Sequence, residues 1–140
     1  MSEGFGPGQL YRVQTDDGRG PWRPGLSKHW IDTESDKPLY PDVVSAFGLE
    51  WRSKIPKGWH CGCACRSLYQ LLSWFTRKEQ ATLAKLGYYV VCFKPDKIIA
   101  EDEYQVIFAR KKPLTDDVQL IGWPELAGVA YGQRAKEISE

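Results

Sequence analysis

The chain has 140 residues, of which 42% are hydrophobic and 26% are charged, and its formal net charge is +1. This length and composition are typical of one globular domain, and the balanced charge gives no electrostatic footprint for nucleic acid. No apolar stretch reaches the ~20 residues that span a bilayer, and the first residues lack a signal-peptide pattern, so we expect a cytoplasmic protein with no membrane partner.

The first half of the chain predicts few regular elements. Residues 1–8 are rich in glycine and indicate a loose arm, and residues 9–15 alternate as a first strand would. Turn-forming residues from 16 to 25 predict a loop. Residues 40–48 predict a short helix, with a proline near its first turn and Gly48 as its stop.

The second half predicts two helices and a run of strands. Ser67 is expected to cap a helix at 68–75, whose leucines have helical spacing. Thr76 and Glu79 form a capping-box pattern that opens a second helix, and this helix ends at Gly87. Strands are predicted at 59–65, 88–93, 97–100 and 104–110, followed by an extended segment at 118–123.

Helices early in the chain and strands clustered late favour an α+β fold over a doubly wound α/β sheet. We expect a single domain with a mixed, mostly antiparallel sheet. The arm of residues 1–8 precedes a domain at 9–113. Residues 114–140 are expected to form a C-terminal extension that packs on the domain or is partly frayed.

Arg12 lies at the centre of the first predicted strand, on the same side as Leu10. A guanidinium that faces a core is costly to bury unless it meets an anion. Arg12 is therefore predicted either to clamp a phosphate group or to form a structural salt bridge or an edge contact.

The late predicted strand begins with acids and an amide, in the segment EDEYQVIF at 101–108. Arg12 together with this segment resembles the ADP-ribosyltransferase family, in which an arginine on the first strand holds NAD and a late strand opens with an E/Q-x-E motif. Glu103 and Gln105 stand at the two motif positions. The resemblance implies an ADP-ribosyltransferase-like core, with Arg12 on the NAD pyrophosphate and with Glu103 and Gln105 as catalytic groups at the ribose.

Two features depart from the pattern of that family. Gln105 occupies the position of the catalytic glutamate, and an amide does not carry the negative charge that stabilises an oxocarbenium-like transition state. The Ser-Thr-Ser motif of the middle strand is missing, and three cysteines and Ser67 occupy its region. The resemblance assigns Ser67 to cofactor binding, and the departures predict low or absent transferase activity.

The loop GRGPWRPGLSKHW at 18–30 combines cations with aromatic rings. Arg19, Trp22 and Arg23 suit a nucleotide, because a guanidinium can bind phosphate while an indole stacks on a base. They equally suit a protein partner, because tryptophan and arginine dominate interface hot spots. They are the candidate cofactor-binding residues under the first interpretation and candidate protein contacts under the second.

Three cysteines alternate after His60 in the segment HCGCAC. A zinc site needs four ligands in tetrahedral placement, and this spacing lacks the C-x2-C knuckle. In a strand the cysteines would line one face, so we expect small core groups, with no metal and no disulfide. A Cys–His nucleophile that uses His29 or His60 is a further alternative.

Two functions from different classes follow from these residues. The first is an NAD-binding mono-ADP-ribosyltransferase that modifies a macromolecular target. The second is a catalytically inactive protein-binding module of phage or mobile-element origin, such as an inhibitor of a host-defence complex of the anti-CRISPR type. If the protein is a transferase, the acids and amide at 101–105 are expected to line a ligand pocket. The alternative for these residues is a solvated turn.

Overall fold

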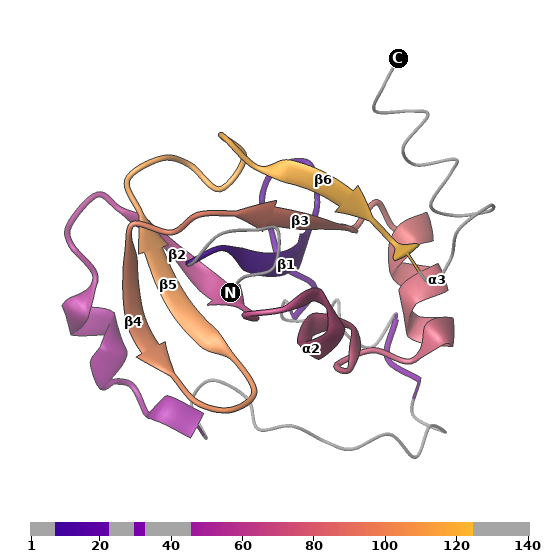
Figure 1. The fold of residues 1–140 in the computed structure, drawn as a ribbon, viewed down its shortest axis with the longest axis horizontal. Coiled ribbons are helices and arrows are strands. Elements are labelled where there is room, and N and C mark those ends of the chain that lie inside the picture. The colour runs from indigo at the N-terminus through magenta and orange to yellow at the C-terminus, as the bar shows by residue number, and fades with distance from the viewer. Residues whose placement is uncertain (1–7, 23–29, 33–45, 125–140) are drawn as a thin grey trace.

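Two antiparallel sheets of three strands each form the framework of the protein (Figure 1). The computed structural model describes residues 8–22, 30–32 and 46–124. All strand pairs within these residues are antiparallel, and short helices accompany them, which confirms the predicted α+β class.

The first sheet has the order β1-β3-β6 and forms around a fully buried central strand. Its strands are β1 (Leu10–Gln14), β3 (Tyr89–Phe93) and β6 (Gln119–Gly122). The central strand has the sequence YVVCF, and β-branched and aromatic side chains of this kind favour a pleated, buried surface. Arg12 of β1 lies opposite Val91 of β3.

The second sheet has the order β2-β5-β4. Its strands are β2 (His60–Ala64), β4 (Lys97–Glu101) and β5 (Val106–Arg110), and the last two form a hairpin. The sheets are joined where Tyr11 passes Cys65, because each backbone N–H donates to the carbonyl of the other residue, at 2.8 and 2.9 Å.

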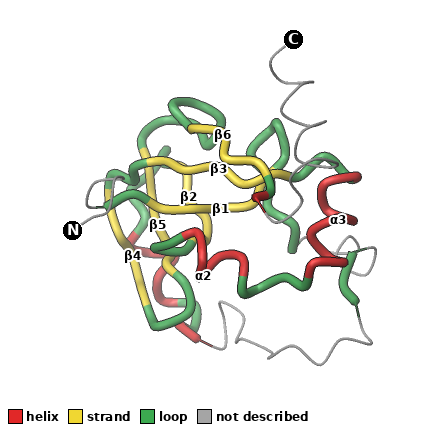
Figure 2. Tube along the Cα trace, turned by 45° about the vertical axis from the view of Figure 1, so that its right-hand side comes forward, coloured by secondary structure: helices red, strands yellow, loops and turns green. Residues whose placement is uncertain are grey.

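Local capping signals determine where the helices begin. The helix α2 (Leu68–Leu72) starts at Ser67, whose side chain accepts a hydrogen bond from the backbone N–H of Gln70. The helix α3 (Arg77–Lys85) begins with the predicted capping box of Thr76 and Glu79. A 3₁₀ helix, η2 (Glu50–Lys54), precedes β2. Figures 1 and 2 show α3 on the side of the molecule away from β4, with α2 between α3 and the second sheet.

The apolar side chains form two clusters. The larger cluster lies between the two sheets and the helices, and includes Phe75, Leu83, Phe108 and Trp123. The smaller cluster covers the other face of the second sheet, where Ile99, Ile107 and Ala109 are buried. Partly buried side chains from the η2 region pack on it: Phe47, Trp51, Ile55 and Trp59. Both faces of β5 are therefore buried.

Two predicted boundaries differ from the structure by two residues or more. The helix predicted at 68–75 ends at Leu72. The late strand begins at Val106 rather than at residue 104, because the residues before it close a turn. Only the end of the helix predicted at 40–48 is described, and Gly48 follows it with a φ of 71°. Residues 1–7 of the predicted arm at 1–8 and residues 125–140 of the predicted C-terminal extension lie outside the described residues.

The absence of a side chain at Gly62 makes room for Arg12. A Cβ atom built on Gly62 would lie 2.7 Å from Nη1 and 3.1 Å from Cζ of Arg12, and 3.3 Å from the ring of Phe108. These distances are shorter than van der Waals contact, and the neighbouring groups are buried. Glycine at this position of β2 therefore allows the guanidinium to lie against the second sheet.

We expect Gly62→Ala to destabilise the protein by about 1–3 kcal/mol, because the added methyl overpacks a buried site. The matched control is Gly20→Ala, whose Cβ would lie 3.5 Å from Arg12 Nη2, an ordinary contact. Urea unfolding monitored by circular dichroism measures both variants. Equal unfolding midpoints for the two would show that Arg12 does not occupy this position in solution.

Candidate functional site

The guanidinium of Arg12 is held by three acceptors from different parts of the chain. Arg12 is only 9% exposed. Its Nε donates to Oε1 of Gln14 at 3.0 Å, Nη1 donates to the carbonyl of Cys63 at 2.9 Å, and Nη2 donates to the carbonyl of Gly18 at 3.0 Å. Each nitrogen of the guanidinium thus donates to an acceptor within the protein.

No carboxylate among the described residues pairs with Arg12. Burial lowers the pKa of Arg12, and the nearby thiols of Cys63 and Cys61 partly oppose this effect. Carbonyl dipoles and the ring of Phe108, whose centroid lies 5.9 Å from Cζ, replace the lost water. Arg12 therefore has the contacts of an arginine with a structural role. Its acceptors are two peptide carbonyls and a side-chain amide instead of the carboxylate of a salt bridge.

Arg12 also holds the loop that follows β1. Gly18 accepts one of its hydrogen bonds, and Gly20 packs against Nη2. The backbone of the loop closes on itself, because the N–H of Thr15 donates to the carbonyl of Arg19 at 2.9 Å. The side chain of Arg19 is exposed and lies 3.3 Å from the carboxylate of Asp17. The buried arginine therefore fixes the backbone that presents Arg19.

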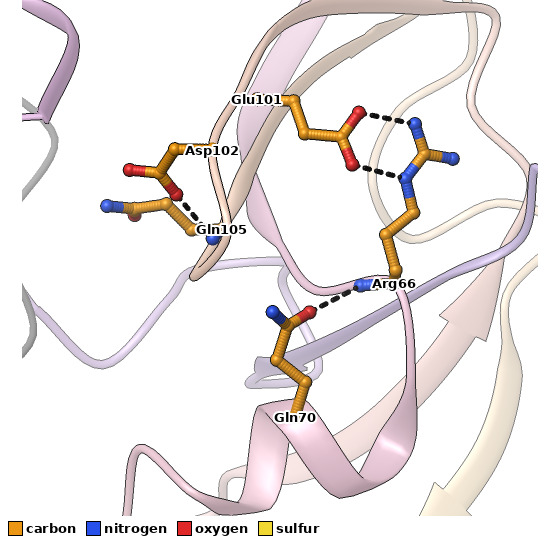
Figure 3. A network of polar contacts seen from close by, with 5 residues as sticks. All are labelled: Arg66, Gln70, Glu101, Asp102 and Gln105. Atoms are coloured by element: carbon orange, nitrogen blue, oxygen red, sulfur yellow. Dashed lines mark hydrogen bonds and ion pairs between the residues drawn. The ribbon is translucent and has the colours of Figure 1, made fainter.

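The acids and amide at 102–105 form the turn of the β4–β5 hairpin. Oδ1 of Asp102 accepts hydrogen bonds from the backbone N–H groups of Tyr104 and Gln105, at 2.8 and 2.9 Å. Figure 3 shows the bond from Gln105. The N–H of Asp102 donates to the carbonyl of Gln105 at 3.0 Å. This is the turn chemistry for which aspartate is favoured. Glu103 is exposed in the turn and Gln105 is buried, so the two do not share a strand face.

Side chains near α2 tie this turn to the helix. Arg66 donates to both carboxylate oxygens of Glu101, at 2.8 and 2.7 Å (Figure 3). The side chain of Gln70 accepts from the backbone N–H of Arg66 and donates to the carbonyl of Glu103. Trp74 Nε1 donates to the carbonyl of Tyr104 at 3.2 Å. The corner is therefore a cross-linked junction between helix and hairpin.

The predicted site residues thus fall into two groups. Ser67, Glu103 and Gln105 lie near one corner, where Ser67 serves as the helix cap. Arg12 contacts the second sheet at Gly62 and Cys63, which lie opposite Phe108 and Ile107 of β5. Its other contacts are with the loop that carries Arg19 and Trp22, and Arg23 lies outside the described residues.

The two cysteines of β2 and Cys65, which follows it, differ in exposure but are all free thiols. Cys61 is exposed, Cys63 is partly buried and Cys65 is buried. Burial raises the pKa of Cys63 to about 11 and that of Cys65 to about 12, so both remain protonated and poorly nucleophilic near neutral pH. In the described ranges, no group of three His, Cys, Asp or Glu side chains is placed to hold a metal ion.

Trp22 forms an aromatic cluster that the sequence only partly indicates. Its indole is 51% exposed, yet it stacks on Phe75 with ring centroids 5.3 Å apart and planes at 26°. The rings of Trp30 and Trp74 each lie 5.5 Å from it in edge-on contact. The sequence indicated Trp22 as a binding residue, but no local pattern assigned Trp74 or Phe75 to its neighbourhood.

The fold and these contacts define a small α+β protein. Its polar side chains join the two sheets to each other, the first loop to the sheets, and α2 to the β4–β5 hairpin. The family model described as Bacteriophage T4 Y00F protein matches residues 1–119. The chain therefore belongs to this phage protein family. Comparisons with curated proteins and with solved structures gave no match, and they lend no support to the ADP-ribosyltransferase resemblance. No helix in the described ranges has the length and apolar character needed to cross a bilayer.

The Arg66–Glu101 pair predicts a defined pH dependence of stability. Arg66 lowers the pKa of Glu101, so the pair stabilises the fold above the unfolded carboxylate pKa and the stabilisation is lost as pH falls through the folded pKa. Both side chains are about 40% exposed, so solvent screening limits the effect to about 0.5–1 kcal/mol. We expect Arg66→Met to lose this much stability at pH 7 but little near pH 3.

Urea unfolding midpoints at several pH values measure this effect. The control is Arg77→Met on α3, because Arg77 is exposed and has no ion pair with a described residue. The control should reproduce the acid dependence of the unmodified protein. An Arg66→Met variant with the same acid dependence as that protein would contradict the pairing of Glu101.

Proposed function

We propose that this phage protein is a non-catalytic binding module that grips a protein partner through the Trp22 surface. This surface consists of Trp22 and the three rings that support it: Trp30, Trp74 and Phe75. The observation that carries the proposal is a half-exposed indole held by stacking and edge contacts with three neighbouring rings.

A tryptophan held in this way has the properties of a binding anchor. Exposed single apolar side chains are common and need no explanation, but few are fixed by neighbouring rings. A rigid anchor loses little conformational entropy when a partner covers it, and its large area contributes strongly to affinity. The Nε1 of Trp30 donates to the carbonyl of Pro21 at 3.0 Å, which fixes the backbone next to Trp22.

The structural role of Arg12 also favours a binding module over a transferase. An NAD clamp requires guanidinium donors directed at the pyrophosphate, and each nitrogen of Arg12 already donates to an acceptor within the protein. The polar turn likewise has a structural role, because Asp102 accepts two backbone N–H groups. NAD cleavage by Glu103 and Gln105 is therefore the less supported function.

Membership of a phage protein family favours a host protein as the partner, and we infer that this partner belongs to a defence complex of the host. The inference about the partner rests on the origin of the family and not on a contact. The binding mode is open to a direct test.

The first test measures the Trp22 surface. Tagged protein expressed in the phage's host is used to capture the partner, and titration calorimetry then measures its affinity for the purified variants. We expect Trp22→Ala to weaken binding by about 2 kcal/mol, roughly 30-fold, because a buried anchor is removed. The control is Tyr69→Ala, which removes an aromatic ring that is 86% exposed on α2. Equal affinities for Trp22→Ala and the unmodified protein would refute the proposal.

The second test addresses the transferase function. The protein and its Gln105→Glu variant are incubated with NAD, and nicotinamide release and the thermal unfolding midpoint are measured. We expect neither release nor a shift in midpoint. NAD cleavage that rises in the Gln105→Glu variant would overturn the binding-module proposal and favour a transferase.

A further inference from the structure

Lysines from three separate loops meet at the end of the second sheet opposite the hairpin turn. Lys57 precedes β2, Lys94 and Lys97 border the link between β3 and β4, and Lys111 and Lys112 follow β5. We call this end the basic pole. In Figure 1, the start of β2, the start of β4 and the end of β5 all lie at the upper left.

Strand pairing and side-chain contacts bring these segments together. His60 at the start of β2 is opposite Arg110 at the end of β5, and Lys97 is opposite Ala109. The backbone N–H of Lys111 donates to the carboxylate of Asp96 at 2.8 Å. The Nζ of Lys111 also lies 5.7 Å from the ring centroid of Trp59. The segments that carry these lysines are therefore neighbours in space although they are far apart in the sequence.

Most of this positive charge is not neutralised. Lys57, Lys94, Lys97 and Lys111 are exposed, and none forms an ion pair with a described residue. The acids within the same segments are Asp96, Asp116 and Asp117, and Asp117 is already paired with Lys112. Asp17 of the first loop, whose Gly18 lies beside Leu114, is paired with Arg19. The cations of the pole thus outnumber its carboxylates.

A buried arginine beneath the surface adds to this charge. Arg110 is 3% exposed, lies over the ring of Phe93 at 5.3 Å, and donates through Nη2 to the carbonyl of Asp116. No carboxylate of the described residues pairs with it. The opposite end of the same hairpin carries Glu101, Asp102 and Glu103. The second sheet is therefore electrically polar from end to end, although the net charge of the chain is only +1.

We propose that the basic pole binds the phosphate backbone of nucleic acid without reading its sequence. The exposed cations are lysines, which act as point charges on flexible stems and neutralise phosphates without the fixed geometry that base-specific contacts need. Protein interfaces are depleted in lysine and enriched in arginine, and the arginine of this pole is buried. A nucleic-acid backbone therefore fits the pole better than an acidic protein surface.

This inference does not depend on the proposed function. The Trp22 surface is supported by the residues that join α2 to α3, whereas the basic pole lies at the far end of the second sheet. A module that carries both surfaces suits a partner complex that itself holds nucleic acid. Each surface is tested with its own variants and its own readout.

The experiment measures fluorescence anisotropy of labelled duplex and single-stranded oligonucleotides at about 50 and 200 mM salt. The pole variant is Lys94→Glu/Lys97→Glu/Lys111→Glu, and a milder variant replaces the same lysines with glutamine. The matched control is Arg77→Glu/Lys78→Glu/Lys85→Glu on α3, which changes the net charge equally through exposed residues. Circular dichroism checks that each variant folds.

We expect the unmodified protein to bind with micromolar affinity at low salt and to lose roughly tenfold or more at high salt, as counterion release requires. The pole variants should lose at least about tenfold in affinity at low salt, while the α3 control changes by less than about threefold. Binding to only one of the two oligonucleotide forms would support the pole and identify the form it takes.

Three results would overturn the proposal. The first is no binding by the unmodified protein at low salt. The second is the same loss in the pole variants and the α3 control. The third is competition by poly-L-glutamate as effective, per charge, as competition by unlabelled oligonucleotide, and it would assign the pole to an acidic protein.

Discussion

Burial of one guanidinium without a carboxylate partner is the constraint on which this structure depends. Arg12 satisfies it by donating to Gln14 of its own strand, to the carbonyl of Cys63 in the second sheet and to the carbonyl of Gly18 in the first loop. A buried donor that loses such a partner costs about 1–3 kcal/mol, so the sheets and the loop are positioned together. Gly62 contributes to this arrangement because the absence of a side chain leaves room for the guanidinium.

The core between the sheets continues this pattern of cations and rings. The rings of Phe93 and Phe108 lie 4.7 Å apart, one from each sheet. Arg12 lies over Phe108 and Arg110 lies over Phe93, so a guanidinium flanks the aromatic pair on either side. Burying a guanidinium in an apolar core costs free energy unless its hydrogen-bond acceptors are in place. We therefore interpret these two arginines and two rings as an arrangement that favours one relative position of the sheets.

Elements with local signals were predictable from the sequence, and contacts between distant segments were not. The capping box and the buried strand at 89–93 follow from neighbouring residues alone. The acceptors of Arg12 include a carbonyl 51 positions away, so a phosphate and a peptide carbonyl could not be told apart beforehand. The acids at 101–103 fitted either a ligand pocket or a solvated turn. The sequence does not show which, because only the geometry of the turn determines whether Asp102 caps it. NAD binding and the target remain predictions.

The pairing of the first strand has a consequence for how the protein folds. Leu10 lies opposite Phe93, and the side chain of Gln14 donates to the carbonyl of Leu114, one hundred positions along the chain. The first strand therefore has no sheet partner until most of the chain has left the ribosome. Contacts of such long sequence separation slow folding, because loop closure precedes any gain from pairing. The α2–α3 region and the β4–β5 hairpin, whose contacts are local, are expected to form first, and Arg12 exchanges water for peptide carbonyls last.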